Sequence, residues 1–311
     1  MREQSASVTT SIHSTPTHIV VDWGTSRLRA TLVDDNGKAL DSVESDQGIQ
    51  HVAPGTHIDV LRHTIGGWLR QLGQLPVYAS GMISSRNGLL ERPCVPCSAG
   101  LAELSSAIHT TVLEDGLTIH IVPGVTDLSS HPFPDVMRGE ETQILGAVDQ
   151  YGCIVLPGTH SKWAHVDDGR IIRFRTVVSG ELFEVMRKHS FIAAGVDRDE
   201  LDEAAFRQGV STALQAPAEL QRHLFSVRTG VITGKLSTEQ TGDYLSGLLI
   251  GHEYLGTHTS SEPLIIVGNA SLTHRYMLTA DELGINSTAG PPDAGLRGMQ
   301  RLRQQQGLSS R

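Results

Sequence analysis

The fold is decided by a short stretch near the N-terminus, HIVVDWGTS, at residues 18–26. It begins as a β-rich apolar run that ends abruptly at a Trp-Gly-Thr-Ser turn, after which residues 28–33 resume an apolar strand pattern. Asn36-Gly37 follows at once, and this dipeptide favours a type I′ hairpin because both residues tolerate positive φ. The stretch therefore predicts a three-stranded meander whose third strand returns antiparallel over residues 38–44.

The pattern after this meander is that of an α/β lobe. Apolar residues recur at helical spacing over residues 58–72, which predicts a helix with one buried face. Short apolar runs predict strands over residues 77–80 and 119–123, and a helix over residues 140–150 closes the first half of the chain.

The same arrangement starts again at Cys153. The second half repeats the order of elements, with strands over residues 154–156, 162–166 and 171–178, a hairpin signal at Asp168-Gly169 and a helix over residues 180–188. A Gly-Thr turn, at residues 158–161, again separates the first two strands, so the chain is predicted to be internally duplicated. Two such turns facing a cleft would present backbone N–H groups to one string of phosphates, and the alternative is two ordinary hairpin turns.

The length of 311 residues exceeds the usual limit of one hydrophobic core, and such chains commonly divide into domains of roughly 150 residues. The duplication predicts where the chain divides. We expect a disordered tail over residues 1–17, an N-terminal lobe over residues 18–150 and a C-terminal lobe over residues 151–311.

Charge and cysteine content exclude several classes of partner and environment. The formal net charge is −9 and the pI about 5.9, so we expect neither nucleic acid nor an anionic membrane surface as a partner. The apolar runs are too short for a membrane span, and the polar N-terminus lacks the apolar core of a signal peptide. Three cysteines cannot all pair, and a core of this size does not require disulfides, so a reducing cytoplasm is expected.

Asp22 ends the first predicted strand, directly beside the first turn. Magnesium prefers oxygen ligands and keeps several waters while it bridges phosphates, so one carboxylate at this position suits it. The alternative is an aspartate that caps its own turn.

Five segments of the chain resemble known proteins. VVDWGTS at residues 20–26 resembles the first phosphate motif of the actin/hexokinase/Hsp70 superfamily. Four others resemble the 2-dehydro-3-deoxygalactonokinase family, namely ASGM at 79–82, VMRGEETQ at 136–143, PGTHSKW at 157–163 and SGLLIG at 246–251. The resemblance runs from about residue 18 to residue 297. It implies a two-lobed, actin/hexokinase-like (ribonuclease H-like) α/β fold with an ATP cleft between duplicated lobes.

The same resemblance implies an activity. A member of this family transfers the γ-phosphoryl group of ATP, with Mg²⁺, to the 6-hydroxyl of 2-dehydro-3-deoxy-D-galactonate in galactonate breakdown. Such a transfer needs a group that orients the acceptor hydroxyl and accepts its proton, and the acceptor must be shielded from water. Closure of the lobes around the substrates is therefore expected.

Candidates for the proton-accepting group lie at the start of the helix predicted at residue 140. Glu140 and Glu141 stand at its N-terminus, where the helix dipole stabilises anions. Sugar kinases of the superfamily commonly place their base at this connection, directly after a glycine. By that resemblance Glu140 is the first choice, Glu141 the second and Asp135 the third, although the commoner base is an aspartate. Ordinary charge at a helix N-terminus is the alternative for both glutamates.

The carboxylate of the expected substrate favours a planar guanidinium, which can bind both oxygens at once. Arg138 and Arg86 are the candidates for this role. Arg86 lies with Ser84 and Asn87 in a loop after a strand end, where α/β proteins usually bind ligands, and Asn87 offers hydrogen bonds to sugar hydroxyls. A surface position without function is the alternative for either arginine.

The residues expected to bind the nucleotide fall into three groups. They are Gly24, Thr25 and Ser26 in the first turn, Gly158, Thr159, His160, Ser161 and Lys162 in or beside the second turn, and Gly268, Asn269 and Ser271 after a strand at 264–267. The last group resembles the superfamily's adenosine motif, because a glycine before a helix N-terminus lets the backbone approach a flat base. A solvated strand lysine is the alternative for Lys162.

Three other functions stay open from the sequence. They are a kinase of another sugar or sugar acid, a non-catalytic nucleotide-gated binding protein of the same fold, and a phosphatase that uses water in place of a sugar hydroxyl. The glutamate pair at residues 140–141 and the compact length favour the small-molecule kinase. The sequence pattern does not decide between galactonate- and gluconate-derived acids, and it leaves the oligomeric state, including a homodimer, open.

Overall fold

A computed structural model describes residues 14–193, 200–258 and 262–309. The chain forms two compact units, here called unit 1 (Met1–Glu91 with His109–Val122) and unit 2 (Arg92–Ile108 with Pro123–Arg311). The units interleave along the chain, whereas the sequence pattern predicts one boundary at residue 150. Residues 1–13 of the expected tail lie outside the described residues, and Pro16 and Thr17 already belong to the first strand.

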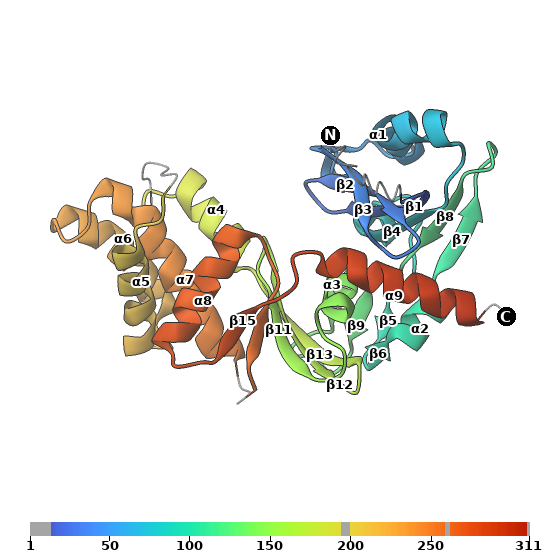
Figure 1. Cartoon of the computed structure of the whole chain (residues 1–311). Helices are drawn as coiled ribbons and strands as arrows, with labels where there is room; N and C mark the ends of the chain where they lie inside the picture. The colour runs from blue at the N-terminus through green and yellow to red at the C-terminus, as the bar shows by residue number, and fades with distance from the viewer. Residues whose placement is uncertain (1–13, 194–199, 259–261, 310–311) are drawn as a thin grey trace, which may run out of the picture. The chain divides into compact units, whose positions relative to one another are not determined.

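Unit 1 is built on a six-stranded sheet with the order β3-β2-β1-β4-β8-β7. Its strands are β1 (Pro16–Trp23), β2 (Leu28–Asp34), β3 (Ala39–Ser45), β4 (Val77–Gly81), β7 (His109–Val112) and β8 (Thr118–Ile121). Helix α1 (His57–Leu72) lies against this sheet and buries Leu61 and Ile65 in the same core as Val21 and Trp23 (Figure 1). The predicted meander and the predicted helix are therefore confirmed.

The turn between β2 and β3 differs from the predicted type I′ hairpin. Gly37 has a φ of 83°, but Asn36 lacks the positive φ that the first central residue of a type I′ turn needs. The cause is the Asp34 carboxylate, which accepts hydrogen bonds from the backbone N–H groups of Asn36 and Lys38, both at 2.9 Å. The second predicted hairpin has the expected geometry, because Asp168 and the following glycine have φ values of 50° and 68°.

Unit 2 contains a second six-stranded sheet, ordered β15-β14-β11-β12-β13-β6, and a three-stranded sheet, ordered β10-β9-β5. The strands are β5 (Val95–Pro96), β6 (Ala99–Gly100), β9 (Val125–Asp127), β10 (Asp135–Met137), β11 (Gly152–Leu156), β12 (Ser161–Asp167), β13 (Arg170–Val177), β14 (Leu264–Ile266) and β15 (Ser287–Ala289). Strand β11 pairs antiparallel with β12 and parallel with β14, as β1 pairs with β2 and β4 in unit 1. This repeated pairing confirms the predicted duplication.

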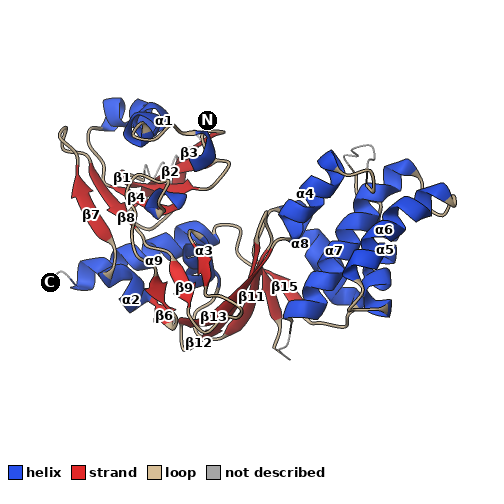
Figure 2. Ribbon diagram, turned by 180° about the vertical axis from the view of Figure 1, so that it is seen from behind, coloured by secondary structure: helices blue, strands red, loops and turns tan. Residues whose placement is uncertain are grey.

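Most helices of the described chain belong to unit 2. They are α2 (Leu101–Ser106), α3 (Glu140–Ala147), α4 (Ser179–His189), α5 (Glu203–Gln215), α6 (Leu220–Ile232), α7 (Thr241–Thr257), α8 (Ala270–Glu282) and α9 (Ala294–Ser309). Short 3₁₀ helices are η1 (Ile49–His51), η2 (Met82–Ser84) and η3 (Thr238–Gln240). Helix α7 is buried along most of its length because α5 and α6 pack beside it (Figures 1 and 2).

The packing of α3 explains why the units interleave. Helix α3 lies against α9, the C-terminal helix, and α9 also contacts α2. These contacts bring segments from the first half of the chain into unit 2.

Over the described residues, none of the helices combines the length and the apolar character that crossing a bilayer demands.

Candidate active site

The first glycine turn connects β1 to β2 in unit 1. The Gly24 N–H donates to the Arg27 carbonyl oxygen at 2.9 Å and closes the turn. Thr25 and Ser26 are exposed at its tip. The turn therefore leaves the side chains of these two predicted nucleotide-binding residues open to a ligand.

The segment at residues 48–50, which was not predicted to be part of the site, supports this turn. The Ile49 N–H donates to the Gly24 carbonyl at 3.1 Å, and the Gln50 N–H donates to the Thr25 carbonyl at 3.2 Å. A Cβ at Gly48 would overlap the Thr25 carbonyl oxygen, so this position has no room for a side chain. The sequence signal for this contact was Gly48 in DQGIQ, but the turn that it packs against is more than twenty residues away in the chain.

Asp22 is half-buried at the end of β1, opposite Arg29 in the β1–β2 register. Burial raises the pKa of the Asp22 carboxyl, and the charge of Arg29 opposes this shift. The carboxylate is therefore a group whose ionised form a bound cation would stabilise.

The second glycine turn connects β11 to β12 in unit 2. Gly158, Thr159 and His160 are half-buried or exposed, whereas Ser161 and Lys162 are buried. The Ser161 hydroxyl lies 2.9 Å from the hydroxyl of a tyrosine on α8, so it points into the protein interior. The predicted residues of this turn thus divide into an outer group and an inner group.

The N-terminus of α4 packs against the outer part of this turn. The Glu181 N–H donates to the Thr159 carbonyl at 2.9 Å, and the Nε2 of His160 lies 2.7 Å from Glu181 Oε2. A Cβ at Gly180 would overlap the Gly158 carbonyl oxygen and lie 2.9 Å from the Thr159 Cα. A glycine is therefore required where α4 meets the turn.

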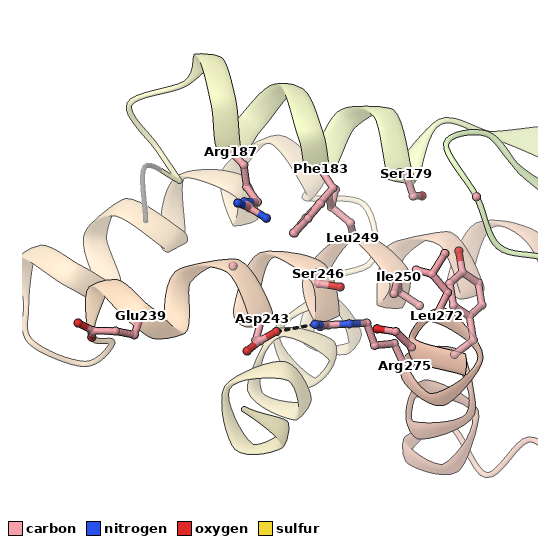
Figure 3. A pocket seen from close by; sticks show the side chains of 15 residues that line it. Ser179, Phe183, Arg187, Glu239, Asp243, Ser246, Leu249, Ile250, Leu272 and Arg275 are labelled. Atoms are coloured by element: carbon pink, nitrogen blue, oxygen red, sulfur yellow. Dashed lines mark ion pairs between the residues drawn. The ribbon is translucent and has the colours of Figure 1, made fainter. Parts of the chain in front are cut away.

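A pocket with a volume of about 260 Å³ opens beside the second turn (Figure 3). Helices α4, α7 and α8 supply most of its lining, which consists of Gly158, Ser179, Gly180, Phe183, Arg187, Glu239, Gly242, Asp243, Ser246, Leu249, Ile250, Ser271, Leu272, Arg275 and Tyr276. Two aromatic residues and three aliphatic ones give it an apolar surface beside a few charged groups. This combination is typical of small-molecule sites and suits a flat base attached to a polar sugar.

One ion pair defines the charged side of the pocket. Arg275 Nη2 lies 2.8 Å from Asp243 Oδ1, and both side chains are largely buried (Figure 3). The other Asp243 carboxylate oxygen accepts from the Asp202 N–H at 2.8 Å, and the Arg275 guanidinium lies over the Phe206 ring. Each member of the Arg275–Asp243 ion pair is thus held by a further contact, Asp243 by a backbone N–H and Arg275 by an aromatic ring.

Two of the predicted nucleotide-binding residues, Gly158 and Ser271, line this pocket. Gly268 and Asn269 are exposed just before α8, and the Asn269 side chain caps this helix by accepting from the Leu272 N–H at 2.9 Å. The charged lining residues were not predicted from the sequence, because they come from α4, η3, α7 and α8 and meet only in the folded chain.

Glu140 is half-buried at the first position of α3. Its Oε2 accepts from the Arg138 N–H at 3.0 Å, and its Oε1 lies 3.9 Å from Lys162 Nζ. The Lys162 ammonium also donates to Thr176 Oγ1 at 3.0 Å. Lys162 is buried, so it is not the solvated strand lysine of the alternative interpretation.

The other two candidate bases are engaged in the fold. Glu141 is fully buried, and its Oε2 accepts from the Gly139 N–H at 2.7 Å. The Asp135 carboxylate accepts from both the N–H and the hydroxyl of Thr176 at 2.6 Å and thereby links β10 to β13. Glu140 is more exposed than Glu141, and which of the three carboxylates acts as the base stays a prediction.

The predicted substrate-binding residues belong to both units. In unit 1, Ser84 is buried and donates to the Gly81 carbonyl at 3.1 Å, whereas Arg86 and Asn87 are exposed. In unit 2, Arg138 donates from Nη2 to the Arg92 carbonyl at 3.1 Å, which holds its guanidinium at that carbonyl. The substrate-binding role of all four residues stays a prediction.

Comparisons with known proteins agree with these features. A family model described as 2-keto-3-deoxy-galactonokinase matches residues 22–302. The 2-dehydro-3-deoxygalactonokinase of Escherichia coli (strain K12) is 34% identical over 292 residues, which cover 91% of this chain and 97% of the relative. The crystal structure of a Sinorhizobium meliloti protein named for the same enzyme gives a TM-score of 0.80 at 31% identity, covering 91% of this chain and 96% of that one.

The fold is shared more widely. The xylulose kinase of Lactobacillus acidophilus gives a TM-score of 0.50 at 12% identity, covering 94% of this chain and 90% of that one, and this likeness shows the fold alone. The expected two-lobed actin/hexokinase-like α/β architecture is thereby confirmed. Because the matching model and the relatives span nearly all of its length, the chain belongs to the 2-keto-3-deoxy-galactonokinase family.

Proposed function

We propose that this chain is a kinase that transfers the γ-phosphoryl group of ATP to the 6-hydroxyl of 2-dehydro-3-deoxy-D-galactonate. The observation that carries the proposal is the family match over residues 22–302, together with a relative of this name that is 34% identical. Phosphoryl transfer depends on positioning and electrostatic stabilisation, so the site must hold a nucleotide, a cation and an acceptor hydroxyl.

The nucleotide base and ribose are proposed to occupy the pocket between α4, α7 and α8. Phe183 and the aliphatic lining offer contact area for the base, and Arg275 with Asp243 offers charged hydrogen-bonding groups. The pocket reaches the second turn at Gly158, whose backbone has no side chain to block a phosphate. Backbone N–H groups of this turn and of the first turn are the proposed phosphate ligands.

The magnesium ion is assigned to Asp22. The fit rests on its half-buried carboxylate, whose pKa burial raises, at the strand end beside the first turn. No group of three or more His, Cys, Asp or Glu side chains able to hold a metal occurs within the described ranges, so one carboxylate with phosphates and water suits this chain. When bound, the ion would neutralise phosphate charge during transfer.

Glu140 is the proposed base. As the bond between the γ-phosphorus and the ADP oxygen breaks, a new bond forms to the sugar-acid 6-oxygen, and the hydroxyl proton passes to the Glu140 carboxylate. Lys162, with its Nζ 3.9 Å from Glu140 Oε1, restrains this carboxylate and adds positive charge near the reacting group. Arg138 and Arg86 are the proposed partners of the substrate carboxylate.

A coupled ADP-release assay tests the proposal. The chain is incubated with ATP and magnesium and with 2-dehydro-3-deoxygalactonate, 2-dehydro-3-deoxygluconate, galactose, glycerol or no acceptor. Strong turnover with the first acid alone is the expected result. Equal turnover without any acceptor would overturn the kinase assignment, and preferential turnover with another acceptor would overturn the substrate.

A further inference from the structure

A buried chain of hydrogen bonds connects the start of β12, directly after the second turn, to the C-terminal part of α7. Glu253 lies on α7 with a relative exposure of 3%. Its Oε1 accepts from Trp163 Nε1 at 2.7 Å and from the Tyr276 hydroxyl at 2.8 Å. The Tyr276 hydroxyl also lies 2.9 Å from the Ser161 hydroxyl.

The donors of this network have a fixed direction. A tyrosine hydroxyl has one proton, and Tyr276 gives it to Glu253, so Ser161 must donate to Tyr276. The sequence of donors therefore runs from Ser161 through Tyr276 to Glu253, with Trp163 as the second donor to the same oxygen. Removal of the carboxylate would leave two buried donors without their acceptor.

A carboxylate in this core is costly for the fold. Burial raises the pKa of Glu253, and the side chains of Ser179, Trp163, Tyr276 and Ser161 oppose this shift. An apolar side chain of similar size is often as stable as a buried charged group or more so, whereas a buried hydrogen-bond network restricts the arrangement of the elements that it joins. Here the network joins β12, α7 and α8.

One end of the network lies at the proposed nucleotide site, but Glu253 itself does not line that site. Ser161 is the first residue of β12, directly after the second turn, and Tyr276 lines the pocket, whereas Glu253 is not part of the lining. The outer side of the turn is held by α4, through the Glu181 N–H to the Thr159 carbonyl. The inner side depends on the Ser161 hydroxyl.

We propose that Glu253 is a positioning residue for nucleotide binding: through Tyr276 it fixes Ser161 and thereby the direction in which the second turn presents its N–H groups to phosphate. This inference rests on the proposed function, because it requires that the second turn binds the phosphates of ATP. It adds a residue that lies outside the pocket and acts on the site through another side chain.

Three variants and one control separate positioning from stability. Tyr276→Phe keeps the ring and removes the hydroxyl that links Ser161 to Glu253, and Glu253→Leu removes the acceptor. Glu253→Gln keeps a carbonyl oxygen for both donors and is the conservative rescue. Tyr254→Phe is the matched control, because the Tyr254 hydroxyl is equally buried and donates to the Tyr276 carbonyl at 2.7 Å without contacting Ser161.

The measurements are the dissociation constant of a non-hydrolysable ATP analogue with magnesium, by titration calorimetry, and the KM values for ATP and for the sugar acid. Tyr276→Phe and Glu253→Leu should raise the analogue's Kd and the KM for ATP about fivefold to tenfold, as expected from the loss of one buried hydrogen bond, with the KM for the sugar acid unchanged. Glu253→Gln and Tyr254→Phe should stay within about twofold of the wild type.

The inference is overturned if Tyr276→Phe or a folded Glu253→Leu binds the analogue as the wild type does, or if Tyr254→Phe weakens binding as much as Tyr276→Phe. If Glu253→Leu does not fold, the other two variants still decide. Because analogue binding needs no acceptor, a wild type that binds it but does not phosphorylate the sugar acid would refute the proposed function alone.

Discussion

Gly180→Ala should impair the use of ATP without unfolding the chain. Gly180 lies at the start of α4, where its Cα faces the backbone of the second turn. An added Cβ would overlap the Gly158 carbonyl oxygen and lie 2.9 Å from both the Gly158 carbonyl carbon and the Thr159 Cα. All three atoms are backbone, so no flexible side chain can move aside and the turn itself must shift.

The magnitude follows from the cost of overpacking. Forcing an extra methyl group into a packed site typically costs about 1–3 kcal/mol. If the turn moves to relieve this strain, a similar free energy is lost from phosphate binding, and a tenfold change in an equilibrium corresponds to about 1.4 kcal/mol. We therefore expect kcat/KM for ATP to fall about 10-fold to 100-fold, with the KM for the sugar acid within about twofold of the wild type.

The assay is ADP release at saturating sugar acid with ATP varied, accompanied by thermal unfolding of each protein. Gly256→Ala is the matched control, since an added Cβ at this helical position meets nothing within 4 Å. That variant should be as active as the wild type and up to about 1 kcal/mol more stable, because alanine favours helix over glycine. A folded Gly180→Ala protein with wild-type kcat/KM for ATP would refute the assignment of this turn to phosphate binding.

Three further predictions concern carboxylates of unit 2. Glu140→Gln should lower kcat at least about 100-fold while calorimetric affinity for the ATP analogue stays unchanged, and a variant that keeps a substantial part of the wild-type kcat would exclude Glu140 as the base. Asp135→Asn should lower the free energy of unfolding by about 1–3 kcal/mol, because the carboxylate satisfies two donors of Thr176, and a denaturant titration without loss contradicts this role. Burial raises the pKa of Glu253 above 4.5, so the folded chain binds the Glu253 carboxyl proton more tightly than the unfolded chain does. The stabilisation that comes from this proton is fully present below pH 4.5 and is lost as the pH rises through the pKa of the folded chain. The free energy of unfolding of Glu253→Gln should therefore increase relative to the wild type as the pH is raised, and a pH-independent difference would contradict the shift.

The sequence predicted the elements that depend on local pattern. Both meanders, helix α1 and the repeated glycine turns were predicted correctly, because alternating apolar residues and glycine turns specify strands and their ends within a few residues. The turn at Asn36 was not, because the side chain of Asp34 decides its geometry through two hydrogen bonds. A dipeptide preference does not contain that information.

Features that depend on distant contacts were beyond the sequence pattern. The lining of the pocket combines Phe183 on α4, Asp243 on α7 and Arg275 on α8, and only the folded chain brings these helices together. The pairing of Lys162 with Glu140 likewise joins two motifs that were identified separately. The residues of each motif were found from the sequence, but their partners were not.

The most direct test of the central claim is to follow the γ-phosphoryl group itself. The chain is incubated with ATP, magnesium and 2-dehydro-3-deoxygalactonate, and the products are identified by phosphorus NMR with coupling to the sugar-acid protons. We predict ADP and one phosphate ester on the 6-oxygen in equal amounts. Release of inorganic phosphate with the sugar acid unchanged, or an ester at another hydroxyl, would contradict it.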